Sequence, residues 1–300
     1  MTSTSIAKTF LEENLNIRAS SFIPRQWLEF KDHRWVNVSD MSIMQKVFIN
    51  ESDLSYQLKE KIMYEIAVMA FDGDFMSNLD KNKKLICFTN GVYDLSCGTF
   101  RNGKMDDYIS LCVNYPYLQT YDKNCLLSKE IDNFFEKVMP DEKMRNYLMK
   151  ILSSCLDGNV NESIYAFVGN NGLIIIDMLM DCLGDLGRKI NEKNIMDELI
   201  KTKGVRACFI NQAEIAMDLG FMKILTGGDV LTNNDLPYPI YFTPVFKLFI
   251  KCDDLSVIKT NDKGIQRRLS IIPFSSVSLK VETDWRQLLM CKLIDGYNMI

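Results

Sequence analysis

The spacing of apolar residues differs between the N-terminal and C-terminal halves of the chain. Over residues 53–71 and again over 127–156, apolar side chains recur at the three- and four-residue spacing of one helix face. Pro140 interrupts the second stretch, and the acidic residues Asp141 and Glu142 follow it, as suits the start of a new helix. We therefore predict one helix in the first stretch and two in the second.

Short strands are predicted between these helical stretches. Residues 35–38 alternate between apolar and polar side chains, and residues 85–88 form a short apolar run that ends at the turn Asn90-Gly91. Residues 92–95 and 99–101 then flank a second turn. The N-terminal part is accordingly expected to be a mainly helical domain with small strands.

After Gly158 the apolar residues form continuous runs, which are typical of strands buried on both faces. Helical or loop segments separate these runs, so we predict a parallel α/β sheet. We place the domains at residues 1–157, 158–280 and 281–300, the last being a single truncated C-terminal helix. The four runs are residues 163–168, 207–210, 246–250 and 269–274.

Composition places the chain among ordinary globular proteins, since 47% of its 300 residues are apolar and 25% are charged. The 35 basic and 39 acidic residues give a net charge of −4, so contact with nucleic acid would need a local basic patch. No apolar run approaches the ~18 residues of a membrane span, and the N-terminus lacks the features of a signal peptide. We expect no membrane association.

The positions of the cysteines and of the histidine restrict the kinds of metal site and nucleophilic mechanism that the chain could have. The nine cysteines are scattered without a C-x-x-C pair, which favours reduced thiols in an intracellular protein and argues against a metal site. His33 is the single histidine, so any histidine-dependent nucleophilic mechanism would have to use it. It lies among Trp27, Phe30 and Trp35, and we interpret it as a structural residue of an aromatic cluster.

One segment has the order of a nucleotide-phosphate site: a buried strand, a loop of glycine and asparagine, and a helix. The loop residues are Gly169, Asn170, Asn171 and Gly172. By itself this segment is a weak signal and is better explained as a plain turn.

The motifs in their order along the chain resemble the poxvirus-type helicase-primase family of large DNA viruses, phages and plasmids, which are superfamily 3 helicases. Upstream, the similar segments are 27–35, 90–95, 100–101 and 106–110; in the α/β part they are 164–172, 183–185, 223–229, 246–253 and 267–274.

The resemblance implies a ring, a homo-hexamer or a hetero-ring with an active paralogue, of AAA+-type domains. Such rings use ATP and Mg²⁺ to move along DNA. It also implies that Arg267 and Arg268 reach phosphates bound by a neighbouring subunit, and that Lys223 leads into a DNA-contacting hairpin. The expected location is a reducing compartment, the host cytoplasm or a viral replication site.

The chain departs from the family at the phosphate loop. Gly169 and Gly172 are three positions apart where the family has five, which shortens the loop by two residues. Leu173 stands at the lysine position and Ile174 at the Ser/Thr position, and neither side chain donates to phosphate or binds Mg²⁺.

The acidic and sensor positions are also altered. Gln212 stands where the family places a glutamate, and Glu214 follows two residues later, on the same face of an extended strand. Asp253 replaces the sensor asparagine and would repel a γ-phosphate. The hairpin over residues 230–238 contains no Lys or Arg, which counts against DNA binding through that loop.

Three functional hypotheses follow. The favoured one is a non-catalytic ring or DNA-replication subunit with a defective NTP site, because Arg267 and Arg268 are retained. The alternatives are an active NTP-dependent DNA helicase and a decayed paralogue without function. Each retained residue also has a plain explanation: the arginines as a solvated strand edge, and Lys223 as the exposed face of an amphipathic helix.

Overall fold

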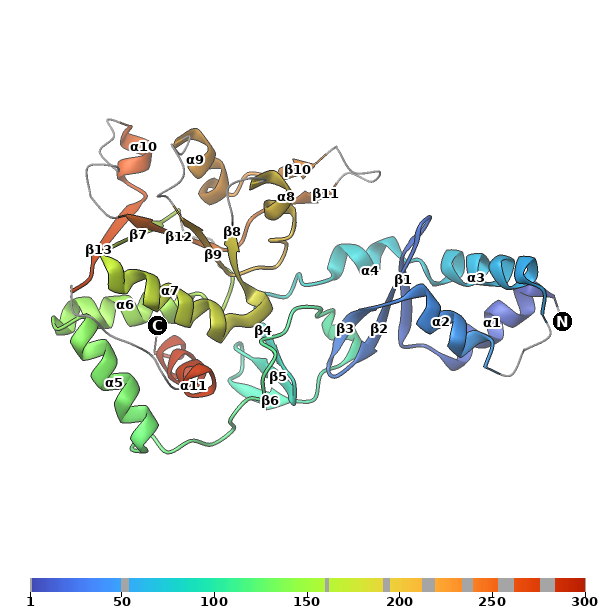
Figure 1. The fold of residues 1–300 in the computed structure, drawn as a ribbon, viewed down its shortest axis with the longest axis horizontal. Helices are drawn as coiled ribbons and strands as arrows, with labels where there is room; N and C mark the ends of the chain where they lie inside the picture. Colours follow the sequence, from blue (N-terminus) through green and yellow to red (C-terminus); the bar gives the residue numbers. More distant parts are fainter. Residues whose placement is uncertain are drawn as a thin grey trace. The chain divides into compact units, whose positions relative to one another are not determined.

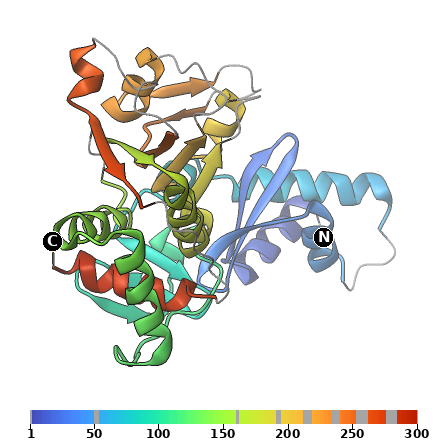
Figure 2. The same ribbon diagram turned by 60° about the vertical axis from the view of Figure 1, so that its left-hand side comes forward.

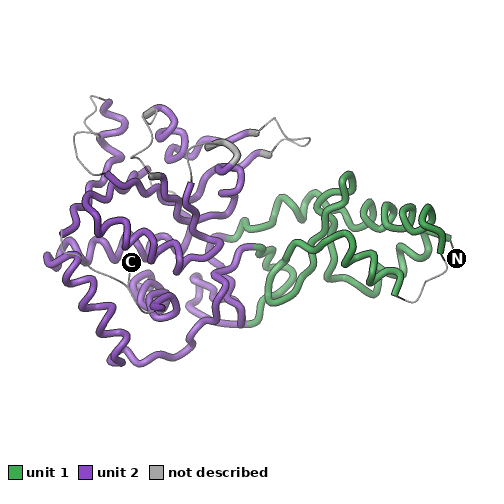
Figure 3. Tube along the Cα trace, in the orientation of Figure 1, with its two compact units in different colours: residues 1–82, 102–110 green, residues 83–101, 111–300 purple. Residues whose placement is uncertain are grey.

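The computed structural model describes residues 2–49, 54–159, 162–190, 195–211, 219–233, 240–252, 262–275 and 284–299. Its chain divides into two compact units, the first comprising residues 1–82 and 102–110 and the second residues 83–101 and 111–300 (Figure 3). The domain boundary predicted near 157–162 therefore falls inside unit 2.

Unit 1 combines a three-stranded antiparallel sheet with helices. The strands are β1 (Ile17–Phe22), β2 (Arg25–Lys31) and β3 (Arg34–Val38); the helices are α1 (Ser3–Glu13), α2 (Asp40–Val47), α3 (Tyr56–Ala70), α4 (Gly73–Asn78) and the short 3-10 helix η1 (Met105–Asp107). Helix α3 confirms the helix predicted over residues 53–71, and β3 confirms the predicted strand. Strands β1 and β2 were not predicted.

The predicted aromatic cluster is divided between two cores of unit 1. Trp27 belongs to the core under α1, α2 and α3, where its indole N–H donates to Asp40 Oδ1 at 2.7 Å. Trp35 packs instead against Phe30 and Phe75, with ring centroids 5.6 and 4.8 Å away. His33 lies in the β2–β3 turn with a φ of 67°, and its Nδ1 accepts from the Gly103 N–H at 3.2 Å. These contacts give His33 a structural role.

Unit 2 is built on a five-stranded sheet in which every neighbouring pair is parallel, in the order β13-β7-β12-β9-β8. Its strands are β7 (Ile164–Val168), β8 (Gly187–Ile190), β9 (Ala207–Asn211), β12 (Lys247–Cys252) and β13 (Leu269–Pro273). The four predicted apolar runs are confirmed as strands. The edge strand β8 escaped prediction because Gly-Arg-Lys-Ile is not an apolar run.

Helices cover both faces of this sheet (Figures 1 and 2). On one face α5 (Leu126–Val138), α6 (Glu142–Ser154), α7 (Asn170–Leu183) and α11 (Arg286–Tyr297) share a core with aromatic strand residues such as Tyr165, Phe167 and Phe249. On the other face α8 (Ile195–Ile200), α9 (Leu219–Gly227) and α10 (Lys263–Gln266) pack on smaller residues such as Ala166 and Ile250. The fold is thus mixed α/β, with a parallel core.

Two small sheets complete unit 2. Strands β4 (Leu85–Phe88), β5 (Gly91–Asp94) and β6 (Thr99–Arg101) form the antiparallel sheet predicted over residues 85–101. Strands β10 (Leu231–Asn233) and β11 (Ile240–Phe242) pair antiparallel, as the ends of a hairpin would. Across the described residues of both units, no helix has the length and apolar character that crossing a membrane requires.

Candidate nucleotide-phosphate site

The order of strands in the sheet identifies the strand ends where a ligand is expected. After β7 the chain crosses to the far edge at β8, whereas after β12 it crosses β7 in the opposite direction to reach β13. The carboxyl ends of β7 and β12 therefore form a switch point, where open α/β sheets bind their ligands. Gly169 lies at this point, directly after β7.

The predicted four-residue loop is a single glycine followed by a helix. Val168 ends β7 and Asn170 begins α7, so Asn170, Asn171 and Gly172 form the first helical turn instead of a loop. Gly169 has a φ of 103°, a conformation that favours glycine, and its carbonyl accepts from the Gly172 N–H at 3.2 Å. One residue thus connects β7 to α7.

The segment after β13 packs directly on this turn. The backbone N–H of Phe274 donates to Val168 O at 2.9 Å, and the Asn171 side-chain amide donates to Ser275 O at 2.6 Å. A Cβ on Gly172 would lie 2.9 Å from Phe167 Cβ and 3.1 Å from Phe274 Cδ2. Residues 274–275 therefore pack on one side of the first turn of α7 and bury Asn171, whereas Asn170 stays exposed.

The side chains at the family's lysine and Ser/Thr positions belong to the core. Leu173 and Ile174 are partly buried and pack against the aromatic face of the sheet. The first turn of α7 thus offers backbone N–H groups and the helix dipole to an anion. It brings no positive charge and no hydroxyl group to them.

Arg267 and Arg268 lie at the amino ends of the parallel strands, whereas Gly169 lies at the carboxyl ends. Arg268 immediately precedes β13, and its carbonyl accepts from Ile164 N–H at 2.7 Å, level with the amino end of β7. Arg267 and Arg268 both form ion pairs with Glu162, at 2.8 and 3.2 Å. The structure brings these two predicted residues together and separates them from Gly169 along the strand direction.

Lys223 pairs with a carboxylate of its own unit. Its ammonium group, on α9, forms an ion pair with Asp262, which caps the N-terminus of α10 through the N–H groups of Gly264 and Ile265. The hydrogen bond from Lys223 lowers the pKa of Asp262 below its ordinary value. Lys223 therefore links α9 to α10.

Three predicted site residues and part of the hairpin lie outside the described residues. These residues are Gln212, Glu214 and Asp253, and the hairpin segment is 234–239. The flanking strands β10 and β11 pair Leu231 with Phe242 and Asn233 with Ile240, in agreement with a hairpin at this place.

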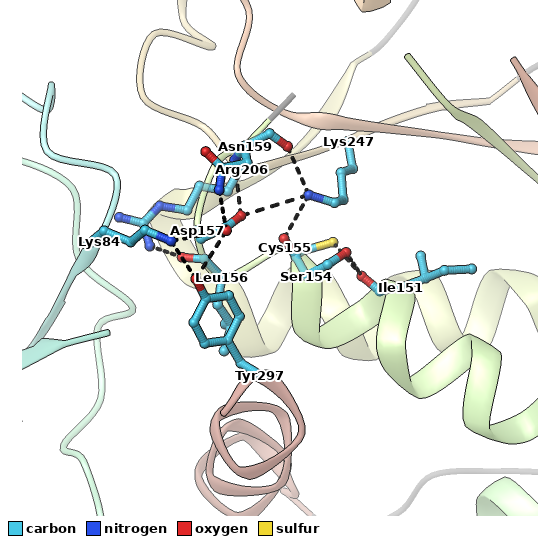
Figure 4. A network of polar contacts seen from close by, with 10 residues as sticks. All are labelled: Lys84, Ile151, Ser154, Cys155, Leu156, Asp157, Asn159, Arg206, Lys247 and Tyr297. Carbon is cyan, nitrogen blue, oxygen red and sulfur yellow. Dashed lines mark hydrogen bonds and ion pairs between the residues drawn. The ribbon is translucent and has the colours of Figure 1, made fainter. Parts of the chain in front are cut away.

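A polar network at the amino end of the sheet was not predicted (Figure 4). Lys247, 3% exposed at the start of β12, donates to Ser154 O at 2.7 Å and to Asn159 O at 3.0 Å. Arg206, 4% exposed just before β9, donates to Leu156 O and Leu85 O. Apart from Leu85 O in β4, these carbonyl groups lie at and after the C-terminus of α6, where positive charge is favourable. The sequence signal was a basic residue at the start of two apolar runs.

Asp157 is the carboxylate of this network. Its Oδ2 accepts from Lys84 Nζ at 3.3 Å and from the Tyr297 hydroxyl at 3.1 Å, so it connects β4 with α11. Burial raises the pKa of Asp157, but the Asn159 backbone N–H together with Lys247 and Lys84 outweighs burial and holds this pKa below its ordinary value. The hydrogen bond to Tyr297 raises the pKa of Lys84. Asp157 and Lys84 therefore stay charged at neutral pH.

Comparison with known proteins identifies relatives of this chain. Residues 23–140 match the family described as "D5 N terminal like". The chain is 34% identical to "Putative helicase L207/L206" of Acanthamoeba polyphaga mimivirus, over 92% of this chain and 35% of that protein. It is 31% identical to "Putative helicase 121R" of Invertebrate iridescent virus 3, over 74% of this chain and 26% of that protein. The chain therefore spans about a third or less of these relatives' length.

The fold has a counterpart among solved structures. The A form apo structure of the NrS-1 C terminal region superposes with a TM-score of 0.54 at 11% identity, covering 99% of this chain and 68% of that one. At 11% identity this match shows a shared fold. The chain belongs to the D5-type helicase-primase family.

Proposed function

We propose that this chain is a superfamily 3, AAA+-type helicase-primase homologue of viral DNA replication that does not turn over NTP itself. In this proposal it joins a ring with an active relative and contacts DNA as part of that ring. The sheet order, the β10–β11 hairpin and the arginines at the amino end of β13 support the ring assignment. Its place of action is a replication site in the infected cell.

One observation carries the proposal of a defective NTP site: a single residue connects β7 to α7, and residues 274–275 pack against the first turn of α7 at Asn171 and Gly172. A phosphate loop needs an open backbone cradle, a lysine and a Ser/Thr hydroxyl group for Mg²⁺. The turn supplies a buried asparagine and two core side chains in their place. These residues do not fit Mg²⁺–ATP, so we derive no hydrolytic step for this chain.

The amino-end network supports a working subunit over a decayed paralogue. A buried lysine and a buried arginine that keep well-formed hydrogen bonds are costly to leave unpartnered, because a buried polar group without a partner destabilises the fold. Drift without selection would damage such a network early. The chain therefore keeps the features that hold the fold together while its phosphate loop is altered.

A nucleotide titration tests the defective site. A fluorescent ATP analogue with Mg²⁺ is added to the chain, to the variant Leu173→Lys with Ile174→Thr, and to a relative with a complete phosphate loop as positive control. We expect no saturable binding by the chain or by the variant up to millimolar nucleotide, because the two side chains do not lengthen the one-residue connection. Micromolar binding by the unmodified chain would instead support an active helicase.

Co-assembly tests the ring assignment. The chain is mixed with the same relative, and the size of the complexes is measured by sedimentation with and without single-stranded DNA. Mixed rings are the expected result. Failure to assemble at micromolar concentrations would favour the decayed paralogue.

A further inference from the structure

Helix α3 of unit 1 carries apolar side chains on two opposite sides. One side belongs to the core that α3 shares with α1, α2 and the sheet, whereas on the other side Tyr64 is 44%, Val68 45% and Phe71 41% exposed. A helix that is apolar on both sides is typical of a helix with packing partners on both sides. In the described part of the chain, packing covers the first side and leaves the second open to solvent. The residues on the covered side are Ile62, Met63, Ile66, Ala67 and Ala70.

The exposed side of α3 has the spacing of a seam between two helices. Its exposed residues follow one another at intervals of four, three, four and three, and they are Gln57, Lys61, Tyr64, Val68 and Phe71. Residues at these intervals form one stripe that faces a partner helix packed along the same length. We call this stripe the α3 seam. Its N-terminal part is polar and its C-terminal part is apolar, so a partner has to match both parts.

The apolar part of the α3 seam continues onto the β1–β2 turn. The Phe71 ring packs edge-on against the Phe22 ring, with centroids 5.5 Å apart, and the next residue, Ile23, is 59% exposed. Ile23 and the apolar residues of the seam together expose about 350 Å² of side chain, a size that is often functional on a monomer. Each partner of a stable interface buries ~800 Å², so this surface suits a weak, reversible contact.

Opposite charges lie at the two ends of the apolar surface. Lys61 precedes it on α3, and Asp74 lies in the first turn of α4, beyond the C-terminal end of α3 (Figure 1). Both residues are exposed, and neither forms an ion pair within the described residues. The charged residues nearest to them in sequence already have contacts in unit 1. These residues are Lys59, Glu60, Glu65 and Asp72.

We propose that the α3 seam binds the α3 seam of a second copy of this chain, with the two helices antiparallel about a two-fold axis at Val68. Tyr64 lies about 6 Å before Val68 along the helix and Phe71 about 4.5 Å after it, so each Tyr64 meets the Phe71 of the other copy. The same symmetry brings each Lys61 near the Asp74 of the other copy, whereas parallel helices would place Lys61 against Lys61. A two-fold contact closes at two copies and does not build a ring, so this inference is independent of the proposed function.

Sedimentation of the full chain, without nucleotide or DNA, tests the contact. The unmodified chain should show a monomer–dimer equilibrium in the micromolar range. V68D should weaken the dimer roughly a hundredfold, because two carboxylates would then be buried against each other. The matched control is L126D, which changes another exposed apolar helix residue, 75% exposed at the start of α5, and should leave the dimer as it was. A chain that stays monomeric at submillimolar concentration, or a dimer that V68D does not weaken, would overturn the proposal.

Charge reversal tests the antiparallel arrangement without placing a charge in the apolar part. K61E and D74K each bring like charges together at both ends of the contact, so each should weaken the dimer about tenfold. An equimolar mixture of the two variants should recover the unmodified affinity, because the K61E copy is acidic at both ends and the D74K copy is basic at both. A mixture no tighter than either variant alone would show that the helices are not antiparallel. Because no nucleotide, DNA or relative is involved, these failures leave the proposed function as it stands.

Discussion

The two ends of the parallel sheet in unit 2 are built differently. At the carboxyl end of β7, the first turn of α7 packs against Phe274, and its own Asn171 donates to Ser275 O. At the amino end, buried Lys247 and Arg206 bind backbone carbonyls of α6, of the residues after it and of β4, and Asp157 connects Lys247 with Lys84 and Tyr297 (Figure 4).

This contrast shows that the residues that stabilise the fold differ from those at the expected ligand site. Open α/β sheets place their ligands at the carboxyl ends of the strands, and there this chain has core-like packing around β7. The charged groups at the amino end satisfy backbone groups and join segments distant in sequence, such as β4 and α11. A chain can therefore keep the fold of its family while its ligand site changes.

The largest expected effect comes from removing the buried cation of the amino end. Lys247→Met leaves Ser154 O and Asn159 O without a donor and takes away positive charge near Asp157. Hydrogen bonds to a buried charge are worth ~1.5–3 kcal/mol each. We expect the free energy of unfolding of unit 2 to fall by about 3 kcal/mol. It is measured by urea denaturation of the full chain.

The matched control is Lys189→Met. Lys189 also forms an ion pair, with Asp177 at 2.7 Å, but both side chains are about half exposed. Such pairs contribute less than about 1 kcal/mol. Equal losses for the two variants would mean that the amino-end network does not stabilise the fold more than a surface ion pair does.

A second effect is expected at the carboxyl end. Gly172→Ala places a Cβ 2.9 Å from Phe167 Cβ, and overpacking of this kind costs about 1–3 kcal/mol. Phe274→Leu should recover part of the loss in the double variant, because the Phe274 ring is the second close neighbour. Both free energies are measured by urea denaturation.

Gly73→Ala is the control for this substitution. A Cβ at Gly73 has no heavy atom within 4 Å, and the residue begins helix α4. Alanine there should leave stability unchanged or raise it by a few tenths of a kcal/mol. If Gly172→Ala were as harmless as Gly73→Ala, the first turn of α7 would be open and could accommodate a ligand.

Much of the fold was predictable because buried parallel strands and amphipathic helices have distinct periodicities. The apolar runs at 163–168 and 246–250 became β7 and β12, and Pro140 separates α5 from α6 as expected. The edge strand β8 was missed, because Arg188 and Lys189 interrupt the apolar residues. The unit boundary at residue 82 was missed because residues 102–110 return to unit 1, a long-range pairing without a local signal.

The candidate site was predictable in its place but not in its shape. The order of strand, loop and helix located Gly169 after a strand, and the resemblance to the helicase-primase family implied that the loop is two residues short. That the shortening leaves one connecting residue, and that Phe274 fills the adjacent space, depends on β13 lying beside β7. The pairing of Arg267 and Arg268 with Glu162, more than 100 residues away in sequence, depends on tertiary contacts in the same way.

The smallest predicted effect is the acid sensitivity of the amino-end network. Because the pKa of folded Asp157 lies below its ordinary value, the carboxylate stabilises the fold above the unfolded pKa of ~4, and this contribution disappears as the pH falls through the folded pKa. The unfolding free energies of the unmodified chain and of Asp157→Asn, measured by urea denaturation, should differ by a constant amount from pH 7 to about pH 4 and converge below it. All other carboxylates are common to both proteins and cancel in this difference. A difference that widened on acidification would mean that burial outweighs Lys247, Lys84 and the Asn159 N–H, and that the amino end, like the carboxyl end, is held by packing more than by charge.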